Sequence, residues 1–184
     1  MTCLLNRHYV DPKLKIAIDH IAENVQEEYP NTIVAYLDGN FPFYDGFPLL
    51  PHLSHNDGEK LDLAFLYTDH ATGKQLNRKA PSFIGYGAFE APTSHEYNQP
   101  GVCHQKGYWQ YSILGTIIPK WHTENYRFDS ERTSTLMHHI IAEPAIQKVF
   151  IEPHLKYRLK LNSPKIRFHG CKAVRHDDHI HIQL

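Results

Sequence analysis

Two short stretches of the sequence combine histidine and aspartate at spacings suited to a metal ion. The first contains His55 and Asp62, and the second, at the end of the sequence, contains His176, His179 and His181. Hydrolytic zinc sites use three nitrogen or oxygen ligands from the protein and leave a fourth position for water. His55, Asp62 and His181 can supply such a set. The sequence therefore predicts a zinc site.

The elements that would position these ligands are two predicted strands. Residues 179–184 alternate, so that His179, His181 and Gln183 share one face while the intervening apolar residues face a core. Residues 61–67 also alternate, and Asp62 points away from their aromatic face. Two strands of this kind can present a carboxylate and two imidazoles to one site.

Spacing alone does not identify the ligands. With 15 histidines in 184 residues, a histidine seven places before an aspartate is expected about once by chance. His122 and Asp129 repeat the spacing, but without the serine and the glycine that accompany His55. We expect this second pair not to bind metal.

The complete pattern is more specific. His52, Ser54, His55, Gly58 and Asp62 form the string His-x-Ser-His-x-x-Gly-x-x-x-Asp, and His-x-x-His-x-His follows far downstream. Together they resemble the penicillin-insensitive murein endopeptidases, which are grouped with the lysostaphin-type peptidases, the D-Ala-D-Ala metallopeptidases and the hedgehog signalling domain. The resemblance covers residues 52–184, and residues 1–40 have no assigned role.

The resemblance implies roles for individual residues. It makes His55, Asp62 and His181 the zinc ligands and places His52, His176 and His179 around the attacking water. Either His179 or His176 would be the catalytic residue that transfers the proton, and the sequence does not distinguish them. His52 and His176 could instead lie behind the site or on the surface.

Other polar residues have weaker claims to the site. Asp178 could orient His176 or His179 by a hydrogen bond, or it could be an exposed turn residue. Arg175 and Arg132 could bind a substrate carboxylate, although a solvated cation is the simpler interpretation of each. Ser54 could contact substrate or shape the loop. The predicted substrate-binding or supporting residues are His52, Ser54, Asp178 and Arg175.

The function implied by the resemblance is zinc-dependent hydrolysis of peptide bonds in peptidoglycan or muropeptides, of the endopeptidase or carboxypeptidase type, in the cell envelope or periplasm. Two alternatives stay open. One is a zinc-binding interaction domain without turnover, and the other is an intracellular peptidase or amidase that acts on small peptides. The resemblance does not specify which peptide bond is cleaved.

Composition narrows the possible partners. A formal net charge of -1, with 19 basic and 20 acidic residues, argues against a nucleic-acid partner. The sequence contains no predicted transmembrane segment or signal peptide, so membrane contact is expected only through an anchor upstream. Three widely spaced cysteines allow at most one disulfide and indicate no disulfide framework.

The expected fold is a single α+β domain over residues 1–184, in which helices and long loops flank a mainly antiparallel sheet that carries the zinc site. Asp11 and Pro12 begin a predicted helix that ends before Pro30, and Asp129 or Ser130 caps a second one. Further strands are predicted at 32–37, 82–89, 108–118, 149–152 and 165–169. A helical turn is predicted from Pro144, and a short helix after Pro153.

Overall fold

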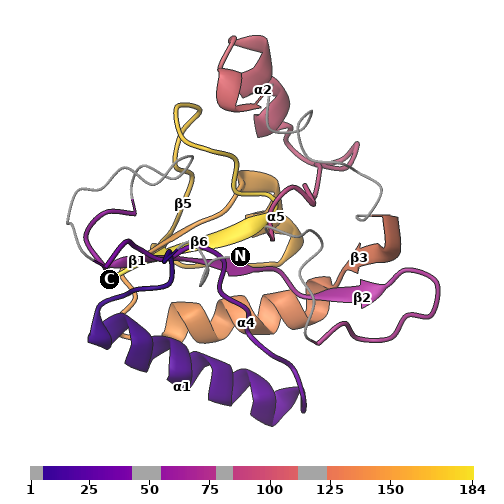
Figure 1. The fold of residues 1–184 in the computed structure, drawn as a ribbon. Helices are drawn as coiled ribbons and strands as arrows, with labels where there is room; N and C mark the ends of the chain where they lie inside the picture. The colour runs from indigo at the N-terminus through magenta and orange to yellow at the C-terminus, as the bar shows by residue number, and fades with distance from the viewer. Residues whose placement is uncertain (1–5, 43–54, 78–84, 112–123) are drawn as a thin grey trace.

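A four-stranded mixed sheet forms the centre of this α+β domain (Figure 1). The computed structural model describes residues 6–42, 55–77, 85–111 and 124–184. The strands lie in the order β1 (Lys60–Ala64), β6 (His179–Gln183), β4 (Lys148–Phe150) and β5 (Ile166–Arg167). The pairs β1–β6 and β6–β4 are antiparallel, and β4–β5 is parallel. The expected mainly antiparallel sheet is thus confirmed.

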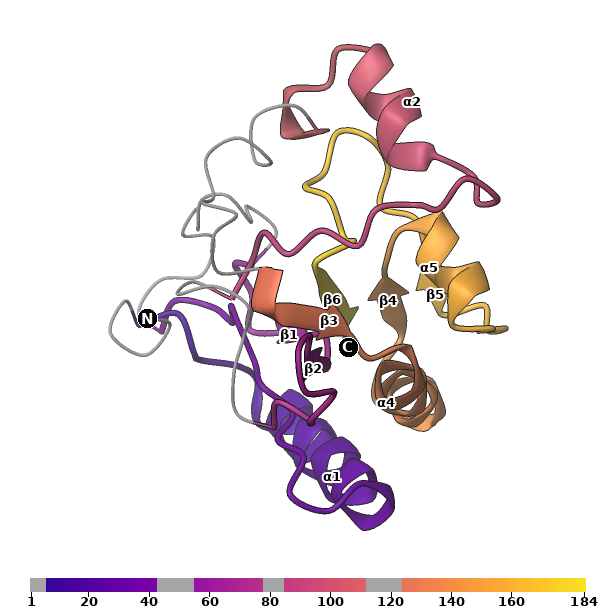
Figure 2. The ribbon, with the colours of Figure 1, turned by 90° about the vertical axis from the view of Figure 1, so that its right-hand side faces the viewer.

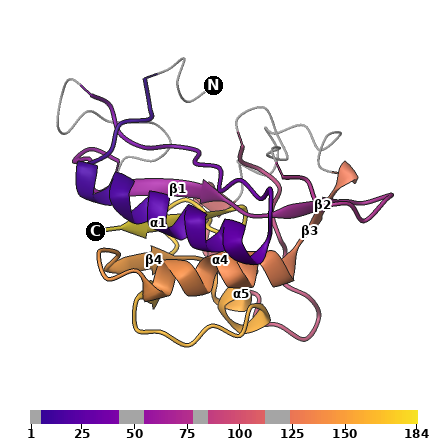
Figure 3. The same cartoon turned by 90° about the horizontal axis from the view of Figure 1, so that it is seen from below.

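Two helices pack side by side against one face of the sheet (Figures 1 and 3). Helix α1 spans Pro12–Glu28, and the Asp11 side chain caps it by accepting a hydrogen bond from the Lys13 N–H. Helix α4 spans Ser130–Ala142, and Asp129 caps it in the same way. Both helices were predicted from their caps and apolar spacing, and both are confirmed.

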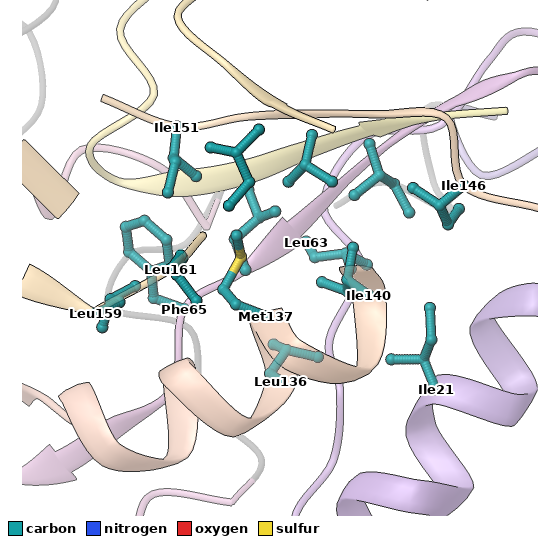
Figure 4. Packing of buried hydrophobic residues seen from close by; sticks show 14 of the residues in the cluster. Ile21, Leu63, Phe65, Leu136, Met137, Ile140, Ile146, Ile151, Leu159 and Leu161 are labelled. Atoms are coloured by element: carbon teal, nitrogen blue, oxygen red, sulfur yellow. The ribbon is translucent and has the colours of Figure 1, made fainter. Parts of the chain in front are cut away.

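The core fills the space between this helical layer and the sheet (Figure 4). Ile180 and Ile182 of β6 and Leu63 of β1 are fully buried, and they meet Met137 and Ile140 of α4. Burying each such side chain contributes about 1.5–3 kcal/mol. One face of β1 and β6 therefore packs in the core, and the alternating residues of these strands, which include polar ones, lie on the opposite face.

Smaller elements surround the sheet (Figure 2). Strands β2 and β3 pair antiparallel in a separate two-stranded sheet. Helix α2 lies on the opposite side of the sheet from helices α1 and α4 (Figure 1). No helix in the described ranges is both long and apolar enough to cross a membrane. The bounds are β2 (Tyr67–Asp69), β3 (Tyr126–Phe128), α2 (Gln99–Gln105), the 3-10 turn η1 (Trp109–Tyr111) and α5 (Pro153–Arg158).

Some strand predictions were wrong. Residues 32–37 lie against β1 but form only the isolated bridge between Tyr36 and Leu63. The Asp62 N–H donates to the Asp38 carbonyl, while Leu37 N–H donates to the Asp62 carbonyl. This one-residue shift is a bulge, which ends regular pairing. The predicted strand 61–67 is interrupted after Ala64 and resumes as β2 at Tyr67.

Other predictions differ in detail. Residues 85–89 are irregular rather than a strand, and residues 109–111 form the turn η1; the rest of these two predicted strands lies outside the described residues. Pro144 begins only a tight turn, closed by the Ile146 N–H and the Glu143 carbonyl. Helix α2 was not predicted. The predicted strands that became β4 and β5 and the short helix α5 are present, each within a few residues of its expected bounds.

Candidate metal centre

Two of the predicted ligands face each other across the β1–β6 pair. Asp62 and His181 are directly opposed in the antiparallel register, and directly opposed residues project from the same face of a sheet. Because Ile180 and Ile182 occupy the core face, His181 and Asp62 point away from it. Both side chains are nevertheless buried, with 2% and 0% of their surface exposed. The alternation predicted for residues 179–184 is confirmed.

His55 completes the group from the loop that precedes β1. Its Nδ1 lies 3.0 Å from the Gly39 carbonyl, and a carbonyl only accepts, so the proton resides on Nδ1 and the Nε2 lone pair points into the site. The loop turns at Gly58, which has φ +80°, a conformation that favours glycine. The Gly58 carbonyl accepts a hydrogen bond from the Asp11 N–H, so the start of α1 anchors this loop.

The three ligand atoms converge on one point. His55 Nε2 lies 3.1 Å from His181 Nδ1 and 3.3 Å from Asp62 Oδ1, and His181 Nδ1 lies 2.8 Å from the same oxygen. Ligands about 2.0–2.1 Å from zinc in a tetrahedron lie about 3.3 Å from one another. The spacing and the donor types therefore fit zinc. Within the described parts of the chain, no other group of three His, Cys, Asp or Glu side chains converges in this way.

Burial suits His181 to this role. Its pKa is lowered to about 4, mainly because burial disfavours the charged ring, although the neighbouring Asp62 acts in the opposite direction. The ring is therefore neutral at neutral pH, as a metal ligand must be. Its Nε2 lies 3.0 Å from the side-chain amide nitrogen of Gln183.

His179 lies next to the ligands and is oriented by a carboxylate. Its Nδ1 donates to Asp178 Oδ1 at 2.5 Å, and the other Asp178 oxygen accepts from the Gly87 N–H at 2.6 Å. Asp178 is 3% exposed, so it is a buried orienting residue and not an exposed turn residue. With the proton on Nδ1, His179 Nε2 can act as an acceptor. This nitrogen lies 3.9 Å from Asp62 Oδ2.

Two further imidazoles border the group. The His176 ring is 4.8 Å from that of His179 and 5.6 Å from that of His181. Burial and the neighbouring imidazoles hold the His176 pKa well below its usual value. His169 lies 5.4 Å from His176, ring to ring, and was not predicted. It follows a short strand at no recognisable spacing, so the sequence contained no signal for it.

Tyr86 is a second site residue that the sequence did not indicate. Its hydroxyl donates to Asp62 Oδ2 at 2.7 Å, and its ring meets the His179 ring edge to face at 5.0 Å. It belongs to the irregular segment 85–90, most of which the sequence predicted to be a strand, and that prediction gave no indication that Tyr86 would reach Asp62. Burial and the adjacent Asp62 hold the Tyr86 pKa well above its usual value, so the phenol keeps its proton at neutral pH.

The two arginines considered for substrate binding have partners inside the protein. Arg175 binds both oxygens of the buried Asp177, at 3.0 and 2.5 Å, and its guanidinium lies over the Phe89 ring. Arg132 is 1% exposed and binds Asp129 and the Tyr67 carbonyl. Asp129 both caps α4 and pairs with Arg132, so it has a structural role.

The structure thus brings together six of the predicted site residues, and Arg175 lies nearby in its ion pair. They are His55, Asp62, His176, Asp178, His179 and His181. His52, Ser54 and His122 lie outside the described residues. No protein-family model matches this chain, and no curated protein matches it. The resemblance of the two motifs to the murein endopeptidases therefore stays a prediction.

Proposed function

We propose that this protein is a zinc-dependent peptidase that hydrolyses peptide bonds of peptidoglycan. The observation that carries the proposal is the convergence of His55 Nε2, Asp62 Oδ1 and His181 Nδ1 at 2.8–3.3 Å, with a carboxylate-oriented imidazole beside it. Three ligands of this kind leave a position open for water, whereas structural zinc sites are closed by four protein ligands.

The three ligands would hold zinc in its ordinary donor environment of two neutral imidazoles and one carboxylate. When bound, zinc lowers the pKa of a water molecule and polarises the carbonyl group of a substrate. The hydrogen bond from His55 Nδ1 to the Gly39 carbonyl fixes the ring of His55. Such a supporting contact keeps a ligand in place before the ion arrives.

His179 is the better candidate for proton transfer. Because Asp178 accepts the proton on Nδ1, Nε2 can take a proton from the attacking water and later deliver it to the leaving amine. Asp178 also stabilises the imidazolium formed between these two steps. The sequence left His176 and His179 equivalent in this respect, and the hydrogen bond to Asp178 supports the choice of His179.

His176 has a different environment. It is 3% exposed, and its low pKa keeps the ring uncharged at neutral pH. Among its described contacts are the rings of His169, His179 and His181. We assign it to the wall of the site, where it supports His179 and limits the access of water.

The substrate class comes from the motif resemblance. One structural observation supports the cell envelope as the location, because Cys103 and Cys171 form a disulfide and disulfides persist mainly in oxidising compartments. The three widely spaced cysteines of the sequence allow one disulfide at most and do not indicate which two would pair.

Two measurements on one preparation test the proposal. Elemental analysis should find about one zinc per chain, the stoichiometry of a site with three protein ligands. Chromatography of purified peptidoglycan digests should show new free amine ends that disappear with a chelator and persist with β-lactams. A preparation that takes up no zinc would refute the metal centre. A zinc-loaded protein that leaves Gram-negative and Gram-positive muropeptides unchanged would instead favour the binding domain without turnover.

A further inference from the structure

The two oxygens of the Asp62 carboxylate have different partners. Oδ1 faces the ligand nitrogens of His181 and His55, at 2.8 and 3.3 Å. Oδ2 accepts the hydroxyl proton of Tyr86 at 2.7 Å. We infer that Tyr86 is a positioning residue that restricts Asp62 to metal binding through Oδ1 alone. This inference rests on the metal centre proposed above.

Tyr86 is well placed to fix the carboxylate because its own segment is anchored. The next residue, Gly87, donates its N–H to Asp178 Oδ2 at 2.6 Å, and Glu90 donates its N–H to the Asp177 carbonyl at 2.7 Å. Residues 87–90 are therefore bonded to residues 177 and 178, immediately before strand β6. The phenol reaches Asp62 from a segment that is held by one hydrogen bond to a side chain and one to the backbone.

The chemical consequence concerns the open coordination position. A carboxylate can bind a metal ion through one oxygen or through both. If Oδ2 turned toward the ion, it would compete for the position that water needs. The Tyr86 hydroxyl donates to Oδ2, and rotation of Asp62 toward two-oxygen binding would break this hydrogen bond. Tyr86 thus keeps a ligand in one geometry, and its edge-to-face contact also holds the ring of His179.

The test is the variant Tyr86→Phe, which removes one hydroxyl and keeps the ring. Titration of the metal-free protein in competition with a chromophoric chelator should show zinc affinity lower by about 10- to 100-fold, the usual effect of losing a partner of a ligand. The Co²⁺-substituted variant should show weaker visible absorption than the wild type, because five-coordinate Co²⁺ absorbs less strongly than four-coordinate Co²⁺.

Tyr111→Phe is the matched control. Its hydroxyl donates to a different buried carboxylate, Glu152 Oε1, at 2.8 Å, so its loss removes the same kind of hydrogen bond away from Asp62. This variant should keep the zinc affinity and the Co²⁺ spectrum of the wild type. A wild type that binds zinc and a Tyr86→Phe variant with the same affinity and spectrum would overturn the role of Tyr86 alone. A wild type that binds no metal would overturn the metal centre as well.

Discussion

His179 and His181 lie two residues apart on the same face of β6, yet their contacts differ. His181 directs Nδ1 at Asp62, 2.8 Å away, inside the ligand group. His179 directs Nδ1 at Asp178, away from that group, and leaves Nε2 on the side of Asp62. The strand supplies both rings, and the different partners of the two Nδ1 atoms are the basis for proposing His181 as a metal ligand and His179 as the group that transfers the proton.

This difference predicts distinct effects of two alanine substitutions. His181→Ala should abolish both zinc binding and turnover, because it removes a ligand. His179→Ala should keep zinc but lower turnover by about 10²–10⁴-fold, the usual contribution of a general base. His176→Ala should also lower turnover more than zinc content, and His52→Ala should be milder. Metal content and rate are to be measured on the same preparations.

His122→Ala is the control for nonspecific effects of removing a histidine, and it should retain zinc. If His179→Ala lost zinc as completely as His181→Ala, then the division between ligand and base would be wrong. His176 would then become the only candidate for the base.

At the scale of the elements, the ligand strand shows what sequence can predict. The alternation of Ile180 and Ile182 with His179 and His181 specifies both a strand and its two faces, because side chains in a strand alternate with period two. Asp62 lies opposite His181 because β1 pairs with β6 in an antiparallel arrangement and in one particular register. The alternation within β6 predicts neither the partner strand nor this register. The motif resemblance, and not the periodicity, identified Asp62 as the partner.

Contacts from irregular segments could not be predicted. Tyr86 and Gly87 reach Asp62 and Asp178 from an irregular segment that the sequence predicted as a strand, and His169 follows a strand of only two residues. The bulge at Asp38 interrupts a segment whose composition is typical of a strand. In each case the conformation depends on hydrogen bonds to residues far away in the sequence, which local propensity does not report.

The junction between β4 and α5 carries a buried carboxyl group behind the site. Glu152 is fully buried, and its Oε1 accepts from the Tyr111 hydroxyl. The backbone N–H of Glu152 donates to the His176 carbonyl at 3.0 Å. Burial, and then the nearby charge of Asp177, raises the pKa of Glu152 to about 7. The pKa of Asp177 is likewise raised, to about 6, mainly by burial.

These two shifts predict a contribution to stability that is lost as the pH rises, opposite in sign to the contribution of the buried histidines with lowered pKa values. The folded protein retains a proton on Glu152 from about pH 4.5 to about pH 7, a range in which the unfolded chain has lost it. Unfolding then releases this proton, so the contribution of Glu152 to the free energy of unfolding falls with increasing pH. Glu152→Gln should flatten this dependence by on the order of 2–3 kcal/mol between about pH 5 and about pH 8.

Urea denaturation at the two pH values measures the effect, with the exposed Glu27→Gln of α1 as the control. Glu27→Gln should leave the pH dependence unchanged. Equal pH dependence in the wild type and Glu152→Gln would mean that Glu152 ionises normally in the folded protein.

At the scale of the whole molecule, the two faces of the sheet have separate tasks. The face toward α1 and α4 is apolar and supplies the core (Figures 1 and 4). The face toward α2 carries Asp62, His179 and His181 (Figure 1). Because side chains alternate along each strand, the polar residues and the core residues lie on different faces. Substitution of a polar residue on the site face therefore removes no side chain from the apolar core.

One covalent link joins the α2 region to the segment that leads into the site. Cys103 of α2 is bonded to Cys171, 68 residues later, and Cys171 lies between His169 and His176. The Gln110 side chain adds a hydrogen bond to the Lys172 carbonyl at 2.8 Å. Residues 169–176 form the wall of the site, and they connect the two-residue strand β5 to β6. We therefore expect the disulfide to limit their motion.

Breaking this disulfide should affect both stability and turnover. Cys171→Ser should lower the free energy of unfolding by about 2–4 kcal/mol, because the unfolded chain gains conformational freedom when a long loop is opened. Turnover should fall because His176 loses its restraint, whereas zinc content should stay the same because His55, Asp62 and His181 lie outside the released segment.

Cys3→Ser is the control, since it leaves the Cys103–Cys171 bond intact. Thermal unfolding, metal content and muropeptide hydrolysis, each measured with and without a reductant, would decide the matter. A reduced protein with unchanged melting temperature and unchanged rate would show that the noncovalent contacts of residues 169–176 suffice to hold the wall of the site.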